Sequence, residues 1–358
     1  MSSTAYPLQC TSLSLDALLH QPAPWKNNAL GVHVYATDTV DIHTQADIAL
    51  PCMPVSMPRL DTGTAICEVW HGSEPTTPGQ LDSIYYRHDQ NVLFGVLVLP
   101  EAGFVANADK TPLQQATESG YRQIFSLLDQ LHYPHLLRLW NYIPDINAHS
   151  QGLERYVQFN LGRQDAFLAH GRDVLGNVPA ACALGFEQKA TRKECLTISF
   201  LAGRVAPLSI ENPRQISAYL YPQQYGSRSP TFSRASLVQI GQEQVLFISG
   251  TASIVGHATL HADDVVAQTR ETMTNIQAVL AEANRHVGKP GFDLSQLNYK
   301  VYIRHPADFA LIRNELAHCV GDALQAVYLQ ADICRQDLLL EIEATAGHPL
   351  LNLSEKPA

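Results

Sequence analysis

The chain has 358 residues, of which 46% are hydrophobic and 16% charged, and its formal net charge is -10 at pH 7. This composition excludes a disordered chain and a coiled coil, and the length accommodates two domains of ordinary size. Because no run of basic residues interrupts the acidic surplus, nucleic acids and anionic membranes are poor partners, and a small anionic ligand requires a local cluster of arginines.

The seven cysteines are scattered along the chain and include no Cys-x-x-Cys pair. This pattern is typical of a reducing compartment and supports neither a disulfide framework nor a zinc knuckle. The N-terminus lacks the basic start and apolar core of a signal peptide, and the apolar run at 92–99 is too short to span a membrane. We therefore expect a soluble, cytoplasmic protein.

Short apolar runs at 30–36, 65–70 and 92–99, separated by turn residues, predict strands and long loops in the first 110 or so residues. A helix is predicted to begin at Thr111-Pro112, an N-cap followed by a proline in the first turn, and to end before Pro134. An apolar strand over 135–143 and a less regular helix over 152–170 follow.

A similar order returns in the second half of the chain. Apolar periodicity predicts a helix over 263–284, a strand over 297–304 and a helix over 307–320, followed by strands over 326–332 and 338–345. The segments LRLWNYIPDIN (137–147) and NYKVYIRHPAD (298–308) each contain a proline that leads into a helix, which suggests an internal duplication. The predicted fold class is α+β, with helices on one face of mixed or antiparallel sheets.

The stretch from Pro230 to Ala346 resembles the YjgF/Rid family in five collinear segments. These are SPTFSRASLV (229–238), VLFISGTASI (245–254), DDVVAQTRETMTNIQAVLAEA (263–283), VYIRHPADFALIRNEL (301–316) and LEIEATA (340–346). The resemblance implies a Rid-like, chorismate-mutase-like fold for this part. A plain Rid protein has about the length of this part alone, so the resemblance does not account for the preceding residues.

Most of the chain beyond about residue 110, and more loosely the part before it, resembles the chorismatase family, in which a divergent N-terminal half precedes a Rid-like half. The segments that carry this resemblance are RLWNYIPDIN (138–147), YVQFNLGR (156–163), YGSRSPTFSRA (225–235) and ADICRQDLLLEIEA (331–344). It implies a divergent N-terminal domain over 1–200, itself a candidate Rid-like duplicate, and a catalytic domain over 201–358. It also implies an enzyme that needs no cofactor and converts chorismate to 3-hydroxybenzoate and pyruvate, with 4-hydroxybenzoate as a second product in some members. Other members hydrolyse chorismate to a dihydrodiol.

Two positions associate this chain with the hydroxybenzoate producers of that family. They are a small residue at Gly250, with Ala252 as the second candidate for that position, and Cys334, which we expect to assist proton transfer during aromatisation.

Chorismate carries two carboxylates, so its site requires separated cationic contacts, and the planar guanidinium of arginine suits them. Arg228, Arg304 and Arg335 are the candidates, and Tyr219 and Tyr225 are candidates for phenolic donors to the substrate.

Cleavage of an enol ether begins with protonation of its terminal methylene carbon, which requires an acid that stays protonated near neutral pH. Glu341 lies in the apolar stretch LLLEIEA, where burial raises the pKa of a carboxyl from about 4.3 toward neutrality. Strand alternation places Glu343 on the same side, either as the alternative acid or as a partner that raises the pKa of Glu341 by repulsion.

Several alternatives stay open. His257 and His261 have the spacing of a helical zinc site, but no third ligand is near in the sequence, so we expect no metal. An imine or enamine deaminase, with Arg335 holding the substrate carboxylate, and a binding module for a carboxylated metabolite are the competing functions. The assembly is either a homotrimer or a pseudo-trimeric monomer.

Overall fold

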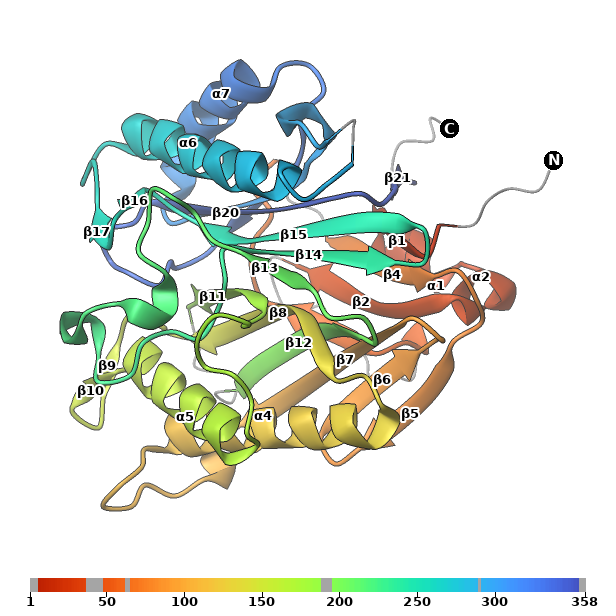
Figure 1. Ribbon diagram of the computed structural model, residues 1–358, viewed down its shortest axis with the longest axis horizontal. Coiled ribbons are helices and arrows are strands. Elements are labelled where there is room, and N and C mark those ends of the chain that lie inside the picture. The colour runs from red at the N-terminus through yellow and green to blue at the C-terminus, as the bar shows by residue number, and fades with distance from the viewer. Residues whose placement is uncertain (1–5, 37–47, 62–64, 188–194, 289–290, 354–358) are drawn as a thin grey trace.

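The computed structural model describes residues 6–36, 48–61, 65–187, 195–288 and 291–353, and it has a mixed α+β fold. Three β-sheets surround a shared interior, and helices cover the outer faces of the sheets (Figure 1). This confirms the predicted fold class.

The middle sheet has six strands in the order β11-β8-β12-β7-β6-β5, and α4 and α5 pack on its outer face. Its elements are β5 (Thr77–Leu81), β6 (Ile84–His88), β7 (Val92–Pro100), the 3-10 helix η1 (Glu101–Gly103), α4 (Pro112–Leu131), β8 (His135–Pro144), α5 (Arg155–Ala169), β11 (Ala180–Phe186) and β12 (Cys195–Gly203). A small hairpin of β9 (His149–Ser150) and β10 (Leu153–Glu154) precedes α5.

The C-terminal sheet also has six strands, in the order β13-β14-β15-β20-β18-β19, with α6 and α7 on its outer face. Its elements are β13 (Leu208–Ile210), η2 (Ala218–Leu220), η3 (Gln223–Tyr225), β14 (Ala235–Ile240), β15 (Glu243–Thr251), β16 (Ile254–Val255), β17 (Ala258–Thr259), α6 (Val265–Asn284), η4 (Leu294–Gln296), β18 (Asn298–Ile303), η5 (Pro306–Asp308), α7 (Phe309–Val320), β19 (Gln325–Gln330) and β20 (Leu340–Ala346).

These two sheets share one topology. In each, three strands and a helix are followed by a central strand, a second helix, an edge strand parallel to that central strand, and a last strand that inserts antiparallel between the third and fourth. The duplicated segments noted in the sequence correspond to β8 and β18, the central strands of the two units.

The N-terminal sheet repeats the inner part of this plan. It contains β1 (Leu8–Ser14), β2 (Ala29–Tyr35), β3 (Cys52–Val55), β4 (Ile66–Gly72) and β21 (Leu350–Asn352), with α1 (Leu15–Leu19) and α2 (Ala23–Asn27) beside it. The order β1-β4-β2-β3 has antiparallel, antiparallel and parallel pairings, as β15-β20-β18-β19 does. One chain thus forms three related sheets.

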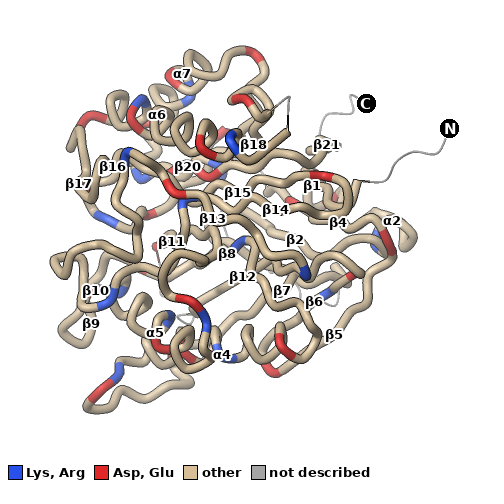
Figure 2. Tube along the Cα trace, viewed as in Figure 1, with Lys and Arg blue, Asp and Glu red and all other residues tan. Residues whose placement is uncertain are grey.

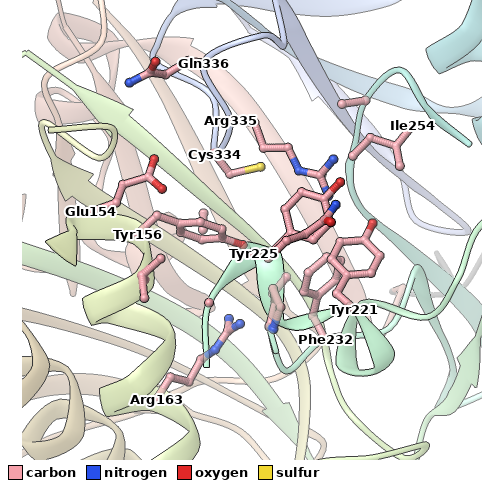
Figure 3. Close-up of a pocket in the computed structure, with 18 of the residues that line it drawn as sticks. Glu154, Tyr156, Arg163, Tyr221, Tyr225, Phe232, Ile254, Cys334, Arg335 and Gln336 are labelled. Atoms are coloured by element: carbon pink, nitrogen blue, oxygen red, sulfur yellow. The ribbon is translucent and has the colours of Figure 1, made fainter. Parts of the chain in front are cut away.

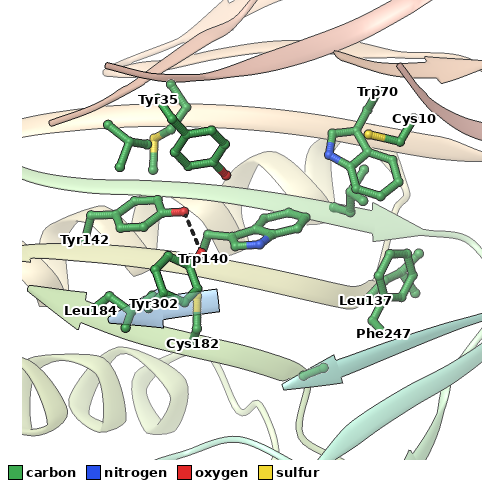
Figure 4. Close-up of a cluster of buried hydrophobic side chains, with 14 of the residues drawn as sticks. Cys10, Tyr35, Trp70, Leu137, Trp140, Tyr142, Cys182, Leu184, Phe247 and Tyr302 are labelled. Carbon is green, nitrogen blue, oxygen red and sulfur yellow. Dashed lines mark hydrogen bonds between the residues drawn. The ribbon is translucent and has the colours of Figure 1, made fainter. Parts of the chain in front are cut away.

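The inner faces of all three sheets meet in a central core. Figure 4 shows Tyr35 and Trp70 of the N-terminal sheet, Trp140 of the middle sheet, and Phe247 and Tyr302 of the C-terminal sheet in one cluster. Separate clusters lie between each sheet and its helices. Because successive side chains of a strand point to opposite faces, each sheet contributes residues both to the central core and to the cluster beneath its own helices.

Charged side chains are distributed mainly over helices and loops, with both signs interspersed (Figure 2). Within the part of the chain that the structure describes, no helix combines the length and apolar character needed to cross a bilayer.

The long helices α4 and α6 begin within two residues of the predicted positions. The Thr111 side chain accepts a hydrogen bond from the Gln114 amide at the start of α4, and Asp264 caps α6 through the Ala267 amide. The less regular helix begins at Arg155, because β9 and β10 occupy part of the preceding segment. The division at residue 200 falls within β12 and stays a prediction.

Candidate active site

A cavity of about 740 Å³ opens between the middle and C-terminal sheets. Its walls come from both halves of the chain, including α5 and β11 on one side and β15, β20 and the 334–337 loop on the other (Figure 3). The size is typical of a small-molecule site.

The N-terminal wall depends on a firmly anchored α5. Arg155, at its first position, forms a buried ion pair with Glu101 and donates a 2.7 Å hydrogen bond from Nε to the Pro144 carbonyl. Further along, a Cβ on Gly162 would lie 2.2 Å from the Gln114 carbonyl oxygen of α4. The absence of a side chain at Gly162 therefore lets the two helices approach closely, which fixes the face that α5 presents.

That face carries Tyr156 and Arg163, which lie two turns apart and both line the cavity. The Arg163 side chain is 1% exposed, stacks over Phe159 at 5.0 Å, and donates a 3.0 Å hydrogen bond to Asn160 Oδ1. Its Nε has no hydrogen-bond partner among the described residues. A buried guanidinium that lacks a carboxylate partner is suited to an anionic ligand.

The C-terminal wall is shaped by a bulge in β15. Ile248 pairs with Ala344 and Thr251 with Ile342, so β15 has one extra residue in this interval. Gly250 lies in the bulge, where a Cβ would lie only 1.8 Å from Glu341 Oε1. The Glu341 carboxyl therefore occupies the space that a side chain at position 250 would need.

Glu341 lines the cavity yet is only 4% exposed, and its Oε1 has no hydrogen-bond partner within the described residues. Burial, and then the negative charge of Glu343, raise the pKa of Glu341 to about 8. Glu343 behaves in the opposite way: although burial opposes its ionisation, Lys300 and Arg138 lower its pKa to about 2. The two glutamates on one face of β20 are thus an acid and a carboxylate at neutral pH.

The 334–337 loop brings Cys334 and Arg335 to the cavity. Burial, and then Glu341, raise the pKa of Cys334 to about 12, so the thiol keeps its proton. The Arg335 guanidinium lies 4.0 Å from the Tyr225 ring centroid and 5.3 Å from that of Tyr221, and donates a 2.9 Å hydrogen bond to the His257 carbonyl. Two aromatic rings thus hold a cation at the cavity wall.

Of the residues expected from the sequence, the structure brings six to the cavity. They are Tyr225, Gly250, Ala252, Cys334, Arg335 and Glu341.

Three others lie outside the cavity lining. Tyr219 lies in η2, and Arg228 is exposed, with Asp165 3.8 Å away. Arg304 donates to Asp332 Oδ1 at 2.8 Å and to three carbonyls of the loop, those of Ile333, Arg335 and Leu338. Its guanidinium is therefore committed to holding the loop that carries Cys334 and Arg335.

The sequence reasoning missed Tyr156, Arg163, Cys182, Tyr221 and Arg234, which also line the cavity. Arg234 is 4% exposed, donates to the Tyr221 hydroxyl at 2.9 Å, and has a buried Nε without a partner in the described part of the chain. Tyr156, Arg163 and Arg234 lie in YVQFNLGR and YGSRSPTFSRA, segments that carry the chorismatase resemblance. The signal that could have identified Tyr156 and Arg163 in the sequence is their seven-residue spacing, which places both side chains on one face of a helix.

The two histidines with zinc-like spacing do not share a helix. His257 and His261 flank β17, and the His257 ring nitrogen Nδ1 lies 3.2 Å from the Tyr225 hydroxyl, whereas His261 Nε2 lies 3.5 Å from Glu271. Among the residues with described positions, no group of three His, Cys, Asp or Glu side chains is arranged to hold a metal ion.

Comparison with known proteins accounts for both halves. Residues 68–202 match the family described as chorismatase FkbO/Hyg5-like, N-terminal, and residues 230–348 match the family described as endoribonuclease L-PSP. A chorismatase of Streptomyces rapamycinicus is 36% identical over 290 residues, covering 79% of this chain and 83% of the relative. A 3-hydroxybenzoate synthase of Streptomyces hygroscopicus is 35% identical over 329 residues, covering 89% and 92%.

A solved structure agrees with these relatives. A chorismatase crystal structure superposes with a TM-score of 0.80 at 31% identity, covering 95% of this chain and 98% of the other. The likeness extends over both halves and therefore over both walls of the cavity. By sequence and by fold, the chain belongs to the chorismatase family.

Proposed function

We propose that this protein converts chorismate to 3-hydroxybenzoate and pyruvate, with 4-hydroxybenzoate as a possible second product. The observation that carries the proposal is Glu341, a buried carboxyl with a pKa of about 8 that lines a cavity also lined by Arg163, Arg234 and Arg335. Such a site offers one proton and several cationic contacts, which are the requirements of a dianionic enol ether.

Substrate binding follows from the arginines that lack carboxylate partners. Arg163 and Arg234 each retain a buried, unpartnered Nε in the described region, and the Arg335 guanidinium packs against the neighbouring rings of Tyr221 and Tyr225. Arg163 of α5 and Arg335 of the 334–337 loop come from different elements around the cavity (Figure 3), so they can receive two separated carboxylates. Arg304 supports the site indirectly by holding the 334–337 loop.

The first chemical step is protonation of the terminal methylene carbon by Glu341. The resulting cation breaks the bond between the ring carbon and the ether oxygen, and pyruvate leaves. Because Glu341 is neutral before the step and anionic after it, its carboxylate then faces the positive ring.

Aromatisation completes the reaction. Attack of the neighbouring ring hydroxyl on the cationic carbon, followed by ring opening and proton loss, yields 3-hydroxybenzoate, whereas direct proton loss yields 4-hydroxybenzoate. Chorismate equals hydroxybenzoate plus pyruvate in atoms, so neither path consumes water, an oxidant or a cofactor. Glu341 regains its proton, and the protonated Cys334 thiol can relay it.

One chain supplies both walls of the cavity and all three sheets around the core. We therefore infer that a pseudo-trimeric monomer is sufficient for activity. Light scattering during gel filtration, with activity measured at the same protein concentration, tests this inference. Activity confined to a higher oligomer contradicts it.

The test of function is incubation with chorismate and no added cofactor, with pyruvate quantified and the aromatic products separated. We expect pyruvate and hydroxybenzoate in equal amounts, and Glu341→Gln should lower kcat by about 10²–10⁴-fold while the variant remains folded by circular dichroism.

Other outcomes discriminate between the alternatives. Pyruvate with a non-aromatic diol identifies a hydrolase and refutes the proposed product. No pyruvate from folded protein refutes the chorismatase activity, and ammonia release from an imine then identifies the deaminase.

A further inference from the structure

A largely buried ion network lies behind the cavity, at the meeting point of the three sheets. Lys300 of β18 contacts Glu68 of β4 at 2.7 Å and Glu343 of β20 at 3.1 Å. Arg138 of β8 pairs with Glu343, and Trp140 Nε1 donates to Glu343 Oε1 at 3.0 Å. Each sheet thus contributes at least one charged group, and two cations face two carboxylates.

The Glu343 carboxylate is held in this network by several buried hydrogen-bond donors. Its two oxygens accept from three donors, and its side chain and those of Arg138 and Lys300 are each less than a tenth exposed. Because a buried charge that loses its partner is strongly destabilising, these contacts hold the charge of Glu343 firmly. A permanent negative charge therefore lies two residues from Glu341.

Alternation along β20 directs both glutamates toward the interior side of the C-terminal sheet, Glu341 into the cavity and Glu343 into the network. The titratable and charged groups around the pair come from every neighbouring element. Tyr35 and His33 come from β2, Arg138 and Tyr142 from β8, and Lys300 and Tyr302 from β18. The others are Tyr156 of α5, Cys182 of β11, Arg234 immediately before β14, and Cys334 of the 334–337 loop.

We propose that Glu343 is a positioning residue for the acid step: its anchored carboxylate repels a second negative charge and so keeps Glu341 in the protonated form that donates to the substrate. This inference rests on the proposed function, because it assigns a role relative to the Glu341 acid. Glu343 itself has no place among the cavity-lining residues. The N-terminal half then contributes to catalysis through Arg138, which holds that charge in place.

Three charged groups with opposing effects act on Glu341 besides its burial. Glu343 raises its pKa, whereas Arg138 and Arg234 lower it, and the contribution of Glu343 is the largest of these. Removing the Glu343 charge leaves the cations unopposed. The pKa of Glu341 then falls, and the acid loses its proton at a lower pH.

The experiment compares the pH dependence of kcat/KM, which reports the free enzyme, for wild type, Glu343→Gln, Glu343→Asp and Glu68→Gln. We expect Glu343→Gln to move the basic limb down by about one pH unit. Glu343→Asp retains the negative charge, so the basic limb of its pH profile should lie at the same pH as in wild type. Glu68→Gln is the matched control, because it perturbs the same network through Lys300, whereas the charges that shift the pKa of Glu341 are those of Glu343, Arg138 and Arg234.

A second readout does not depend on turnover. The infrared band of the protonated carboxylic acid, identified by its loss in Glu341→Gln, should titrate at lower pH in Glu343→Gln. Because that substitution leaves Arg138 without its partner, a double variant with Arg138→Gln removes the pair together. The basic limb of the double variant's pH profile should still lie at lower pH than that of wild type, because Glu343 has a larger effect on the pKa of Glu341 than Arg138 has.

An unmoved limb and an unmoved infrared titration in folded Glu343→Gln overturn the inference. An equal shift in Glu68→Gln also overturns it, because the effect is then a general loss of packing. Failure of the proposed function has a different signature: Glu341→Gln retains turnover, or no variant releases pyruvate. Inactive Glu341→Gln with an unmoved limb in Glu343→Gln refutes only the positioning role.

Discussion

The protonation state of Glu341 makes activity fall as the pH rises through the upper neutral range. With a pKa of about 8, about nine-tenths of the free enzyme carries the acid form at pH 7 and about one-tenth at pH 9. A carboxyl with the ordinary pKa of 4.5 would be protonated in only about 0.3% of molecules at pH 7. Burial and the neighbouring charge of Glu343 together therefore increase the protonated, reactive fraction by about 300-fold at neutral pH.

The assay is the initial rate of pyruvate release between pH 5.5 and 9.5, a range chosen to span the transition by about two units on its acid side. We expect kcat/KM to be flat up to about pH 7 and then to fall toward a slope of tenfold per pH unit above about pH 8. A rate that stays flat to the end of the range, or that already falls tenfold per pH unit from the start of the range as for an ordinary carboxyl, refutes the assignment of Glu341 as a buried acid.

Folding stability provides an independent check on the same group. Since the folded-state pKa of Glu341 lies above its unfolded value of 4.5, this group stabilises the fold fully below about pH 4.5, and the contribution is lost as the pH rises to about 8. Its share of the free energy of unfolding falls by up to about 1.4 kcal/mol per pH unit in that window. Denaturant titrations of wild type and Glu341→Gln at several pH values should show this slope in wild type and a smaller one in the variant.

Three further predictions address other parts of the site. Gly250→Ala places a Cβ 1.8 Å from Glu341 Oε1, so the carboxyl must move, and we expect slower pyruvate release and a changed product ratio by chromatography; an unchanged rate and ratio contradict this. Arg163→Met removes a charged contact worth about 1.5–3 kcal/mol and should lower kcat/KM by about 10–100-fold, whereas Arg228→Met, which alters an exposed arginine outside the cavity, should stay near wild type. Cys334 should resist alkylation by iodoacetamide at pH 7.5 in the folded protein, because its pKa is raised to about 12; rapid labelling followed by mass spectrometry argues against a protonated thiol.

Much of the local structure follows from the sequence. Capping residues and apolar periodicity locate α4 and α6, because helix ends require side chains that satisfy free amides. Alternation in LLLEIEA places Glu341 and Glu343 on one side of a strand. Gly250, Cys334 and Arg335 come from the family resemblance, and the structure places all three at the cavity.

The choice of arginines depends on the tertiary structure. Arg228 and Arg234 are six residues apart, yet only Arg234 lines the cavity, since the path of the loop decides which side chain turns inward. Arg163 reaches the same cavity from α5, where its role depends on the packing of that helix against α4. Arg304 lies outside the cavity lining, because its guanidinium donates to the Ile333 and Arg335 carbonyls, which only the folded segment around the 334–337 loop presents.

From residue 111 onward the sequence predicts the main helices and strands, their repeated order and the strand face that carries two glutamates. It left open which glutamate is the acid, because both have the same local surroundings. The tertiary structure decides this by bringing Arg138 and Lys300 against Glu343 and leaving Glu341 Oε1 without a partner among the described residues. The physical reason is that electrostatic interaction depends on distance across the three sheets and on burial, and neither is encoded in the spacing along one strand.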